Sequence, residues 1–218
     1  MTKNKNSIER HLSNPLLLLI VGAVITGLLV PYITNQWQNH EKELNLKTSL
    51  VARISEAVSR ALTAAQFTNA RLPEVVDYYQ AYHEWETTHS AIGSYIRAYF
   101  PNTYLGEEWD DYANTTTSLI RLSANNSMSE KQQLVSQIQK YFAPCSNNII
   151  NWNALLDKND LRFRNPDFRY NWFALKDQII LAKNNISQKV LELPIFTQNA
   201  FLQPNDETKD SIVNRLRC

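Results

Sequence analysis

The chain has 218 residues, of which 44% are hydrophobic and 20% are charged, as in folded globular proteins and unlike disordered ones. Its 22 lysines and arginines nearly balance its 21 aspartates and glutamates, so no overall field attracts nucleic acid, and no nucleic-acid partner is expected. Its four glycines are scattered, which excludes the glycine-rich loops that bind nucleotide phosphates. No cofactor is expected, and the scarcity of glycine disfavours a strand-rich fold.

After a polar tail over 1–14, the stretch 15–33 carries no charged residue; it begins at Pro15 and ends at Ile33. A helix of about 19 residues is about 30 Å long, which is the thickness of the hydrocarbon core of a bilayer. The sequence therefore predicts one transmembrane helix that anchors the protein in a lipid bilayer. A cleaved signal peptide is the alternative, but no small-residue cleavage site follows the apolar stretch.

The predicted span contains small residues and is flanked by nearly balanced charges. Gly22 with Thr26, and Ala23 with Gly27, are pairs four residues apart, a spacing that lets membrane helices approach closely and self-associate. Lysines and arginines on the two sides of the span are similar in number, and the positive-inside rule gives only a small preference for an N-terminus inside. The soluble domain would then lie outside.

The next segment, 34–70, predicts a juxtamembrane helix that continues from the membrane. Its narrow apolar stripe consists of residues three or four positions apart: Leu46, Leu50, Ile54, Val58, Ala61 and Ala65. Such a stripe packs either on the rest of the domain or against a second copy in a parallel coiled coil. The stripe is short for a coiled coil, so packing on the domain is favoured.

Residues 71–218 are predicted to form an all-α domain, an antiparallel helical bundle. Prolines interrupt this region, and the intervals between them carry apolar stripes with helical periodicity. The predicted helices span 73–100, 105–124, 127–142 and 165–193, with a shorter helix after Pro144. The last long helix has the clearest start, because a capping Asn165, a first-turn Pro166 and an acidic Asp167 follow one another. Long helices joined by short polar loops favour a bundle.

Glu86 and His89 are weak candidates for a metal site. His83 and His89 are six residues apart, so they do not share a helix face as the ligands of the zinc-protease motif do. Glu86 and His89 match the Glu-x-x-His half of a di-iron site, but the sequence offers no second such pair. We therefore favour a histidine hydrogen-bonded in the core, and no metal is expected.

Four carboxylates crowd into about one helical turn, at Glu107, Glu108, Asp110 and Asp111. Such a cluster is able to bind a cation or a basic partner. It also falls in the first turn of the predicted helix 105–124, where the helix dipole stabilises negative charge. A solvated helix start is the favoured interpretation, with interaction as the alternative.

Arg162, Arg164 and Arg169 alternate with aromatic residues, a pattern that contacts anionic lipids or single-stranded nucleic acid. Three arginines are few for such a surface. The aromatic residues also belong to the apolar stripe of the predicted helix 165–193, so a structural role is favoured.

Cys145 and Cys218 are far apart in the sequence, and their spacing matches no metal motif. A disulfide would require a domain outside the cytoplasm. We expect two thiols without a special role.

These features favour a single-pass, membrane-anchored helical domain that acts as a protein-interaction or scaffold module, without catalysis. Its expected partner is another protein or a second copy of the chain. A signalling component that relays its state through the juxtamembrane helix is the first alternative. A helical-bundle enzyme or metal binder that uses Glu86 and His89 is the second.

Overall fold

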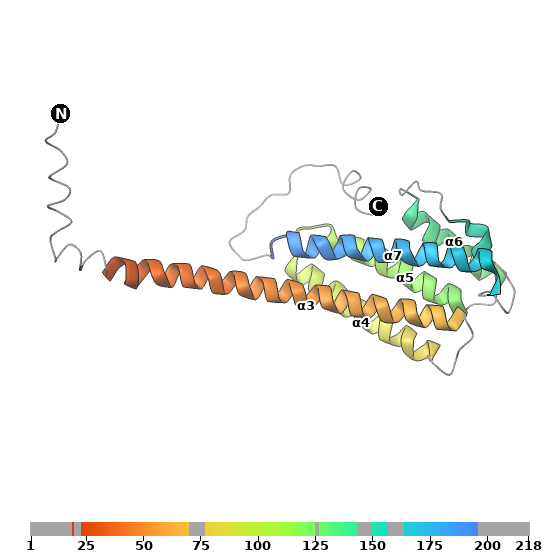
Figure 1. Cartoon of the computed structure of the whole chain (residues 1–218), viewed down its shortest axis with the longest axis horizontal. Coiled ribbons are helices and arrows are strands. Elements are labelled where there is room, and N and C mark those ends of the chain that lie inside the picture. Colours follow the sequence, from red (N-terminus) through yellow and green to blue (C-terminus); the bar gives the residue numbers. More distant parts are fainter. Residues whose placement is uncertain are drawn as a thin grey trace, which may run out of the picture. The chain divides into compact units, whose positions relative to one another are not determined.

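The computed structural model describes residues 19, 23–69, 77–124, 127–143, 150–156 and 164–195, and helices dominate these ranges (Figure 1). No strand occurs in them, so the all-α class is confirmed. Two compact units are distinguished, Met1–Leu46 and Lys47–Cys218. The elements are the π-helix η1 (Ile25–Leu29), the α-helices α3 (Val30–Asn69), α4 (Tyr78–Tyr99), α5 (Leu105–Ala124), α6 (Met128–Phe142) and α7 (Pro166–Glu192), and the 3-10 helix η2 (Trp152–Leu156).

The predicted membrane span falls only partly within the described residues. Pro15 and Gly22 lie outside them, whereas Gly27 belongs to η1 and Ile33 to α3. Among the helices that are described, none is both long enough and apolar enough to cross a membrane.

The ends of α5 and α7 follow their local sequence signals. The bounds of α5 coincide with the predicted range 105–124. At the start of α7, the side chain of Asn165 accepts a hydrogen bond from the backbone N–H of Asp167 at 2.9 Å, and Pro166 occupies the first turn. These contacts satisfy N–H groups that have no partner within the helix.

The predicted start of α4 at residue 73 is wrong, because α4 begins at Tyr78. Asp77 has extended backbone angles and acts as the N-cap. Its carboxylate accepts hydrogen bonds from the backbone N–H groups of Tyr79, at 2.9 Å, and Gln80, at 3.4 Å. A capping carboxylate therefore sets this boundary, rather than the proline that precedes it.

Three lysine side chains hold the bundle part of α3 against α7. Lys47 donates to the backbone oxygen of Leu191 at 3.2 Å, Lys183 to Ser55 at 3.5 Å, and Lys176 to Gln66 at 2.9 Å. Residue numbers rise along α3 while those of its partners fall along α7. The two helices are therefore antiparallel.

Helix α5 lies at the centre of the bundle. Trp85 of α4 donates to Thr117 of α5 at 2.9 Å, and Ser118 of α5 donates to Gln137 of α6 at 3.0 Å. Tyr112 of α5 donates its hydroxyl to the backbone oxygen of Ile179 in α7. Helix α5 thus contacts α4, α6 and α7, which explains why it is buried on several sides.

The predicted helical bundle is confirmed. In Figure 1, α3, α4, α5 and α7 run alongside one another, and α6 lies at the edge next to α5. The four long helices α3, α4, α5 and α7 thus form an antiparallel bundle, and α6 and η2 are inserted in the sequence between α5 and α7.

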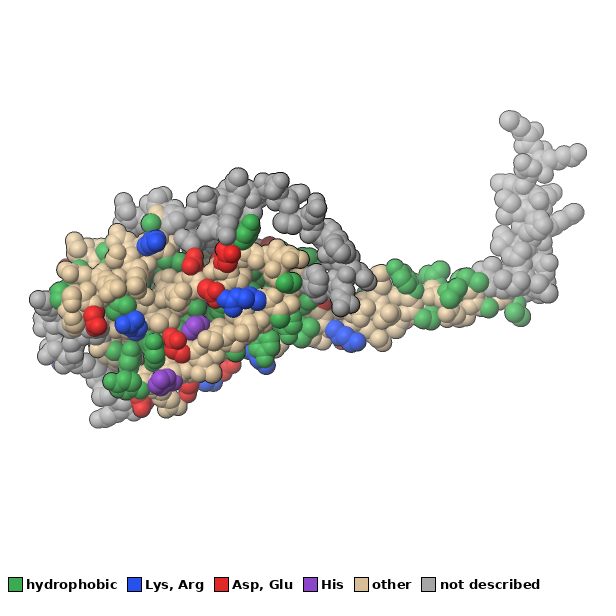
Figure 2. Space-filling model, turned by 180° about the vertical axis from the view of Figure 1, so that it is seen from behind, with side chains coloured by type: hydrophobic (Ala, Val, Ile, Leu, Met, Phe, Trp, Pro, Cys, Tyr) green, Lys and Arg blue, Asp and Glu red, His purple; other side chains and the backbone are tan. Residues whose placement is uncertain are grey.

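Charged side chains of both signs are interspersed over the face of the bundle drawn in Figure 2. No extended area of one sign is visible on that face. This mixed surface agrees with the near-zero net charge and offers no broad basic area there.

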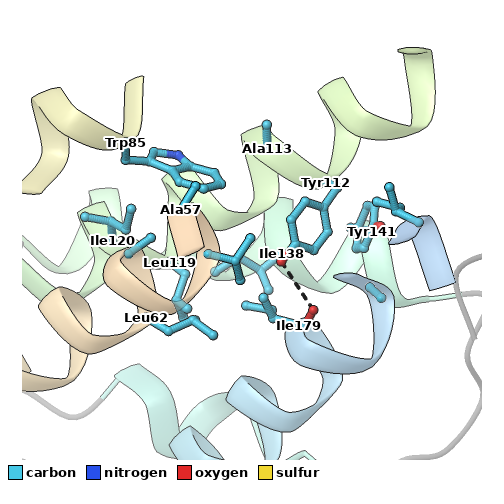
Figure 3. Packing of buried hydrophobic residues seen from close by; sticks show 14 of the residues in the cluster. Ala57, Leu62, Trp85, Tyr112, Ala113, Leu119, Ile120, Ile138, Tyr141 and Ile179 are labelled. Carbon is cyan, nitrogen blue, oxygen red and sulfur yellow. Dashed lines mark hydrogen bonds between the residues drawn. The ribbon is translucent and has the colours of Figure 1, made fainter. Parts of the chain in front are cut away.

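The core is continuous and rich in aromatic residues (Figure 3). Trp109 and Tyr112 of α5 and Trp172 of α7 are almost completely buried. Every residue of the predicted stripe of α7 from Phe168 to Val190 is buried, which confirms that stripe: Phe168, Trp172, Leu175, Ile179, Ala182, Ile186 and Val190. In α3 the stripe is buried only from Leu50 onward, since Leu46 is 43% exposed.

Tyr112 provides a test of this core through pH. Burial raises the pKa of its hydroxyl above the ordinary value of 10.0. The folded protein keeps this proton to higher pH than the unfolded chain does. The free energy of unfolding should therefore fall above about pH 10, by up to about 1.4 kcal/mol per pH unit.

We expect Tyr112→Phe to make the free energy of unfolding fall less steeply with pH above about pH 10. Chemical denaturation in a series of alkaline buffers measures this slope. Tyr79→Phe is the matched control, because Tyr79 is exposed and should leave the slope unchanged. An equal slope in wild type and Tyr112→Phe would contradict the burial of this hydroxyl.

Candidate functional site

A hollow of about 210 Å³ lies between α3 and α4, and we call it the α3–α4 groove. Helix α3 contributes side chains from five positions at helical spacing, and α4 contributes four. The lining residues are Arg53, Glu56, Ala57, Arg60 and Ala61 of α3, and Ala81, Glu84, Trp85 and Thr88 of α4.

Small side chains create the groove. Ala57 and Ala61 of α3 and Ala81 of α4 leave space that leucines would otherwise fill. The indole of Trp85 reaches from α4 towards Ala57 and forms part of the floor (Figure 3). Ala57, Ala61 and Trp85 are buried, so the floor is apolar.

Charged side chains surround one end of the groove. Arg60 contacts Glu56 at 2.6 Å and Glu84 at 3.8 Å, and Glu84 also accepts from Gln80 at 2.9 Å. One guanidinium thus faces two carboxylates, which leaves this end with a net negative charge. All three groups are largely exposed, so these ion pairs contribute little to stability.

Arg53 lies towards the other end of the groove. Its guanidinium carbon is 5.3 Å from the centre of the Tyr95 ring, a cation–π contact. Within the part of the chain that the structure describes, no carboxylate lies within 4.0 Å of Arg53. This end of the groove is therefore positive.

Glu86 of α4 belongs to a hydrogen-bonded chain between α4 and α5, in which it accepts from Thr117 at 3.3 Å. Nε2 of His89 lies 3.5 Å from Glu86 but has no hydrogen-bond partner within the described residues, so the expected hydrogen bond of this histidine is not found. Thr117 in turn accepts from the indole N–H of Trp85. No group of three or more metal-binding side chains is found within the described ranges. These contacts give Glu86, but not the side chain of His89, a role in joining α4 to α5.

The acidic cluster is divided by the structure. Glu107 and Asp111 are exposed, as a solvated helix start requires, and Asp110 pairs with Arg97 of α4. Glu108 instead points into the bundle, where its side chain is only 7% exposed and its carboxylate contacts Lys189 of α7 at 2.5 Å. The interpretation of the whole cluster as solvated is therefore wrong for Glu108.

The pKa of Lys189 reflects the burial of this ion pair. Burial lowers the pKa of Lys189, while the hydrogen bond and the charge of Glu108 oppose the shift. Both partners are mostly removed from water, so each one compensates the buried charge of the other.

The two arginines of the cluster that the structure describes differ in burial from the aromatic residues beside them. Arg164 and Arg169 are exposed, whereas Phe168 and Trp172 are buried and stacked, with ring centres 6.2 Å apart. Arg162, Cys145 and Cys218 lie outside the described residues.

Two glycines mark the close approach of α4 and α5. A β-carbon on Gly93 would come within 3.2 Å of Trp109, and one on Gly106 within 2.9 Å of Arg97. The glycines of the bundle that the structure describes thus serve helix packing.

The α3–α4 groove was not among the sites predicted from the sequence. Arg53 and Thr88 lie on polar helix faces, where single residues give no signal. The alanines at 57, 61 and 81 are a weak signal of a groove, because an alanine that faces another helix leaves space which a larger side chain would fill.

Comparison of the chain with protein-family models, with curated protein sequences and with solved structures found no match.

Proposed function

We propose that the chain is a single-pass membrane protein whose helical bundle acts as a protein-interaction module at the bilayer surface. The observation that supports the anchor is an exposed apolar helix. Val24, Ile25, Leu28, Leu29 and Val30 are each about half exposed or more. Figure 2 shows hydrophobic side chains along this helical segment.

These exposed apolar residues form a surface broader than the narrow stripe of an amphipathic helix. Leu28, Leu29 and Val30 are consecutive, and the other residues of η1, Thr26 and Gly27, carry no charge. A helix with so broad an apolar and uncharged surface is stable when a protein core or a bilayer covers it. With the uncharged stretch 15–33, this favours a bilayer, with localisation to a membrane and a small preference for the N-terminus inside.

The anchor is tested by replacing Val24 and Leu28 together with lysine in the full-length chain. Lysine near the centre of a membrane helix costs about 2.5–3.5 kcal/mol per residue. We expect the wild type to resist extraction from membranes by alkaline carbonate and the double variant to appear in the soluble fraction. Leu44→Lys with Leu46→Lys is the matched control, because these exposed residues lie beyond the predicted span.

The control should remain in the membrane fraction. Extraction of the wild-type protein by carbonate would contradict the anchor.

The interaction role of the bundle is supported by the α3–α4 groove, which is an apolar depression with charged groups around it. The carboxylate of Glu86 is engaged in joining α4 to α5 through Thr117, which favours a structural role for it over metal binding. Cross-linking of the full-length protein in its native membrane, followed by mass spectrometry, tests this role. We expect cross-links from α3 or α4 to another protein or a second copy; cross-links within the chain alone would contradict it.

Signalling remains the second candidate because α3 is one uninterrupted helix from Val30 to Asn69. A relay through such a helix normally needs two copies side by side. Light scattering of the detergent-solubilised full-length chain separates the candidates. A dimer whose two copies cross-link to each other through α3 favours signalling, whereas a monomer or a dimer joined through another surface favours the interaction module.

A further inference from the structure

We propose that the α3–α4 groove binds a small apolar monocarboxylate, such as a short-chain or aryl-substituted carboxylic acid. This inference goes beyond the interaction role proposed above and does not depend on it. It is carried by the size of the groove, by its apolar floor, and by the separation of charge between its two ends.

The size of the groove limits the ligand. Pockets for drug-sized molecules enclose about 300–1,000 Å³, whereas this groove encloses about 210 Å³. Its floor of alanines and Trp85 offers contacts to a hydrocarbon chain or a single ring. The ligand is therefore a small molecule whose middle is apolar.

Arg53 provides the anion-binding group. The Tyr95 ring contacts the guanidinium 5.3 Å from the ring centre, and this contact limits the conformations of a long side chain. A guanidinium on an aromatic face still presents N–H groups at its edge. These match both oxygens of a carboxylate in a bidentate arrangement.

Thr88 provides a second polar group in the groove. Its neighbours on α4 donate their hydroxyls to backbone oxygens one turn earlier: Thr87 to His83 at 2.9 Å, and Ser90 to Glu86 at 2.8 Å. Among the residues that the structure describes, Thr88 makes no such bond. Its hydroxyl lines the groove and is available to a ligand bound there.

The opposite end of the groove excludes a second carboxylate. Arg60 lies beside Glu84, whereas Arg53 lies beside Tyr95, so the two arginines occupy different ends of the antiparallel helix pair. The end at Arg60 carries Glu56 and Glu84 against one cation. A dicarboxylate would bring its second charge towards these acids, and a monocarboxylate would not.

The experiment is isothermal titration calorimetry of the full-length protein in detergent with three six-carbon probes: hexanoate, adipate and hexan-1-ol. We expect saturable binding of hexanoate. Adipate, with a carboxylate at both ends, and hexan-1-ol, with none, should each bind at least about tenfold more weakly, which is the effect of one charge-assisted contact.

Variants of groove residues test whether the measured heat of hexanoate binding comes from the α3–α4 groove. Arg53→Gln removes the cation and should weaken hexanoate binding at least about tenfold. Thr88→Val keeps the shape and should weaken it by less. Ala81→Leu fills the half-buried edge of the groove and should abolish binding. Arg169→Gln is the matched control, since it removes an exposed arginine of α7. It should leave unchanged both the binding of hexanoate to the protein and any uptake of hexanoate by the detergent micelle.

Equal hexanoate binding by Arg53→Gln and Arg169→Gln would overturn the proposal, as would equal binding of adipate and hexanoate or no binding by the wild type. The melting temperature of each variant, compared with that of the wild type, shows whether a loss comes from the groove or from unfolding. Loss of binding with an unchanged melting temperature supports the proposal. Loss of binding by Arg53→Gln through unfolding would overturn the assignment of Arg53 as an exposed ligand-binding group.

Discussion

Replacing Lys189 with methionine should lower the free energy of unfolding by about 3–5 kcal/mol. The side chain of Lys189 is 15% exposed and that of Glu108 is 7% exposed, with 2.5 Å between the ammonium nitrogen and a carboxylate oxygen. Removing the lysine leaves Glu108 charged and largely out of water, between α5 and α7. Chemical denaturation of the full-length protein in detergent, followed by circular dichroism, measures the loss.

The double variant Glu108→Leu with Lys189→Met separates two explanations of that loss. If the cost comes from an uncompensated buried charge, the double variant should recover most of the stability, because an apolar pair of similar volume replaces the ion pair. Lys183→Met is a useful control, since Lys183 is half-buried but bonds only weakly to Ser55, at 3.5 Å. A double variant no more stable than Lys189→Met would show that the ion pair itself is strongly stabilising.

Replacing Trp109 with alanine should also lower the free energy of unfolding, by about 3–5 kcal/mol. Trp109 is fully buried in α5 and lies against Gly93, Trp85 and Tyr112. Its indole N–H donates to the backbone oxygen of His89 at 2.9 Å. The substitution removes both the packing and this hydrogen bond, at a place where α4 and α5 approach closely.

Trp109→Phe tests how the loss is divided. Phenylalanine keeps an aromatic ring in the same space but has no N–H group, so we expect a loss of about 1–3 kcal/mol, made up of the missing hydrogen bond and a smaller cavity. The same denaturation assay measures both variants. If Trp109→Ala were as stable as the wild type, Trp109 would not be part of the core.

The helices were predictable where local chemistry determines them. Asn165 and Pro166 start α7 because a side-chain cap and a proline act within one turn, whatever surrounds them. The stripes of α5 and α7 predicted their buried faces because helical periodicity is a property of each helix alone. For the same reason the sequence indicated a bundle before any contact between helices was known.

The failures occurred where a residue's role depends on its neighbours in space. Leu46 continues the stripe of α3 but lies before Lys47, where the second compact unit begins, and it is exposed. Glu108 looked like part of a solvated helix start, yet it lies three residues after Leu105 and four before Tyr112, on the buried face of α5. That spacing was a usable signal, but the partner on α7, Lys189, was not recognisable.

The α3–α4 groove lies beyond what one sequence reveals. It depends on which alanines of α3 face those of α4, and this pairing follows from the rotation and register of two separate helices. Arg53 becomes distinctive only when Tyr95, 42 positions later, is placed next to it.

The row of aromatic rings across α4 and α5 also provides an intrinsic spectroscopic signal of how these two helices pack. The ring centres of Trp85 and Trp109 are 6.4 Å apart, and those of Trp109 and Tyr112 are 5.6 Å apart. Near-ultraviolet circular dichroism arises from aromatic rings held in fixed, asymmetric surroundings and disappears when specific packing is lost while helices persist. The intact protein should therefore show an intense near-ultraviolet spectrum whose amplitude follows the α4–α5 contact, so that loosening of this contact becomes visible without an added label.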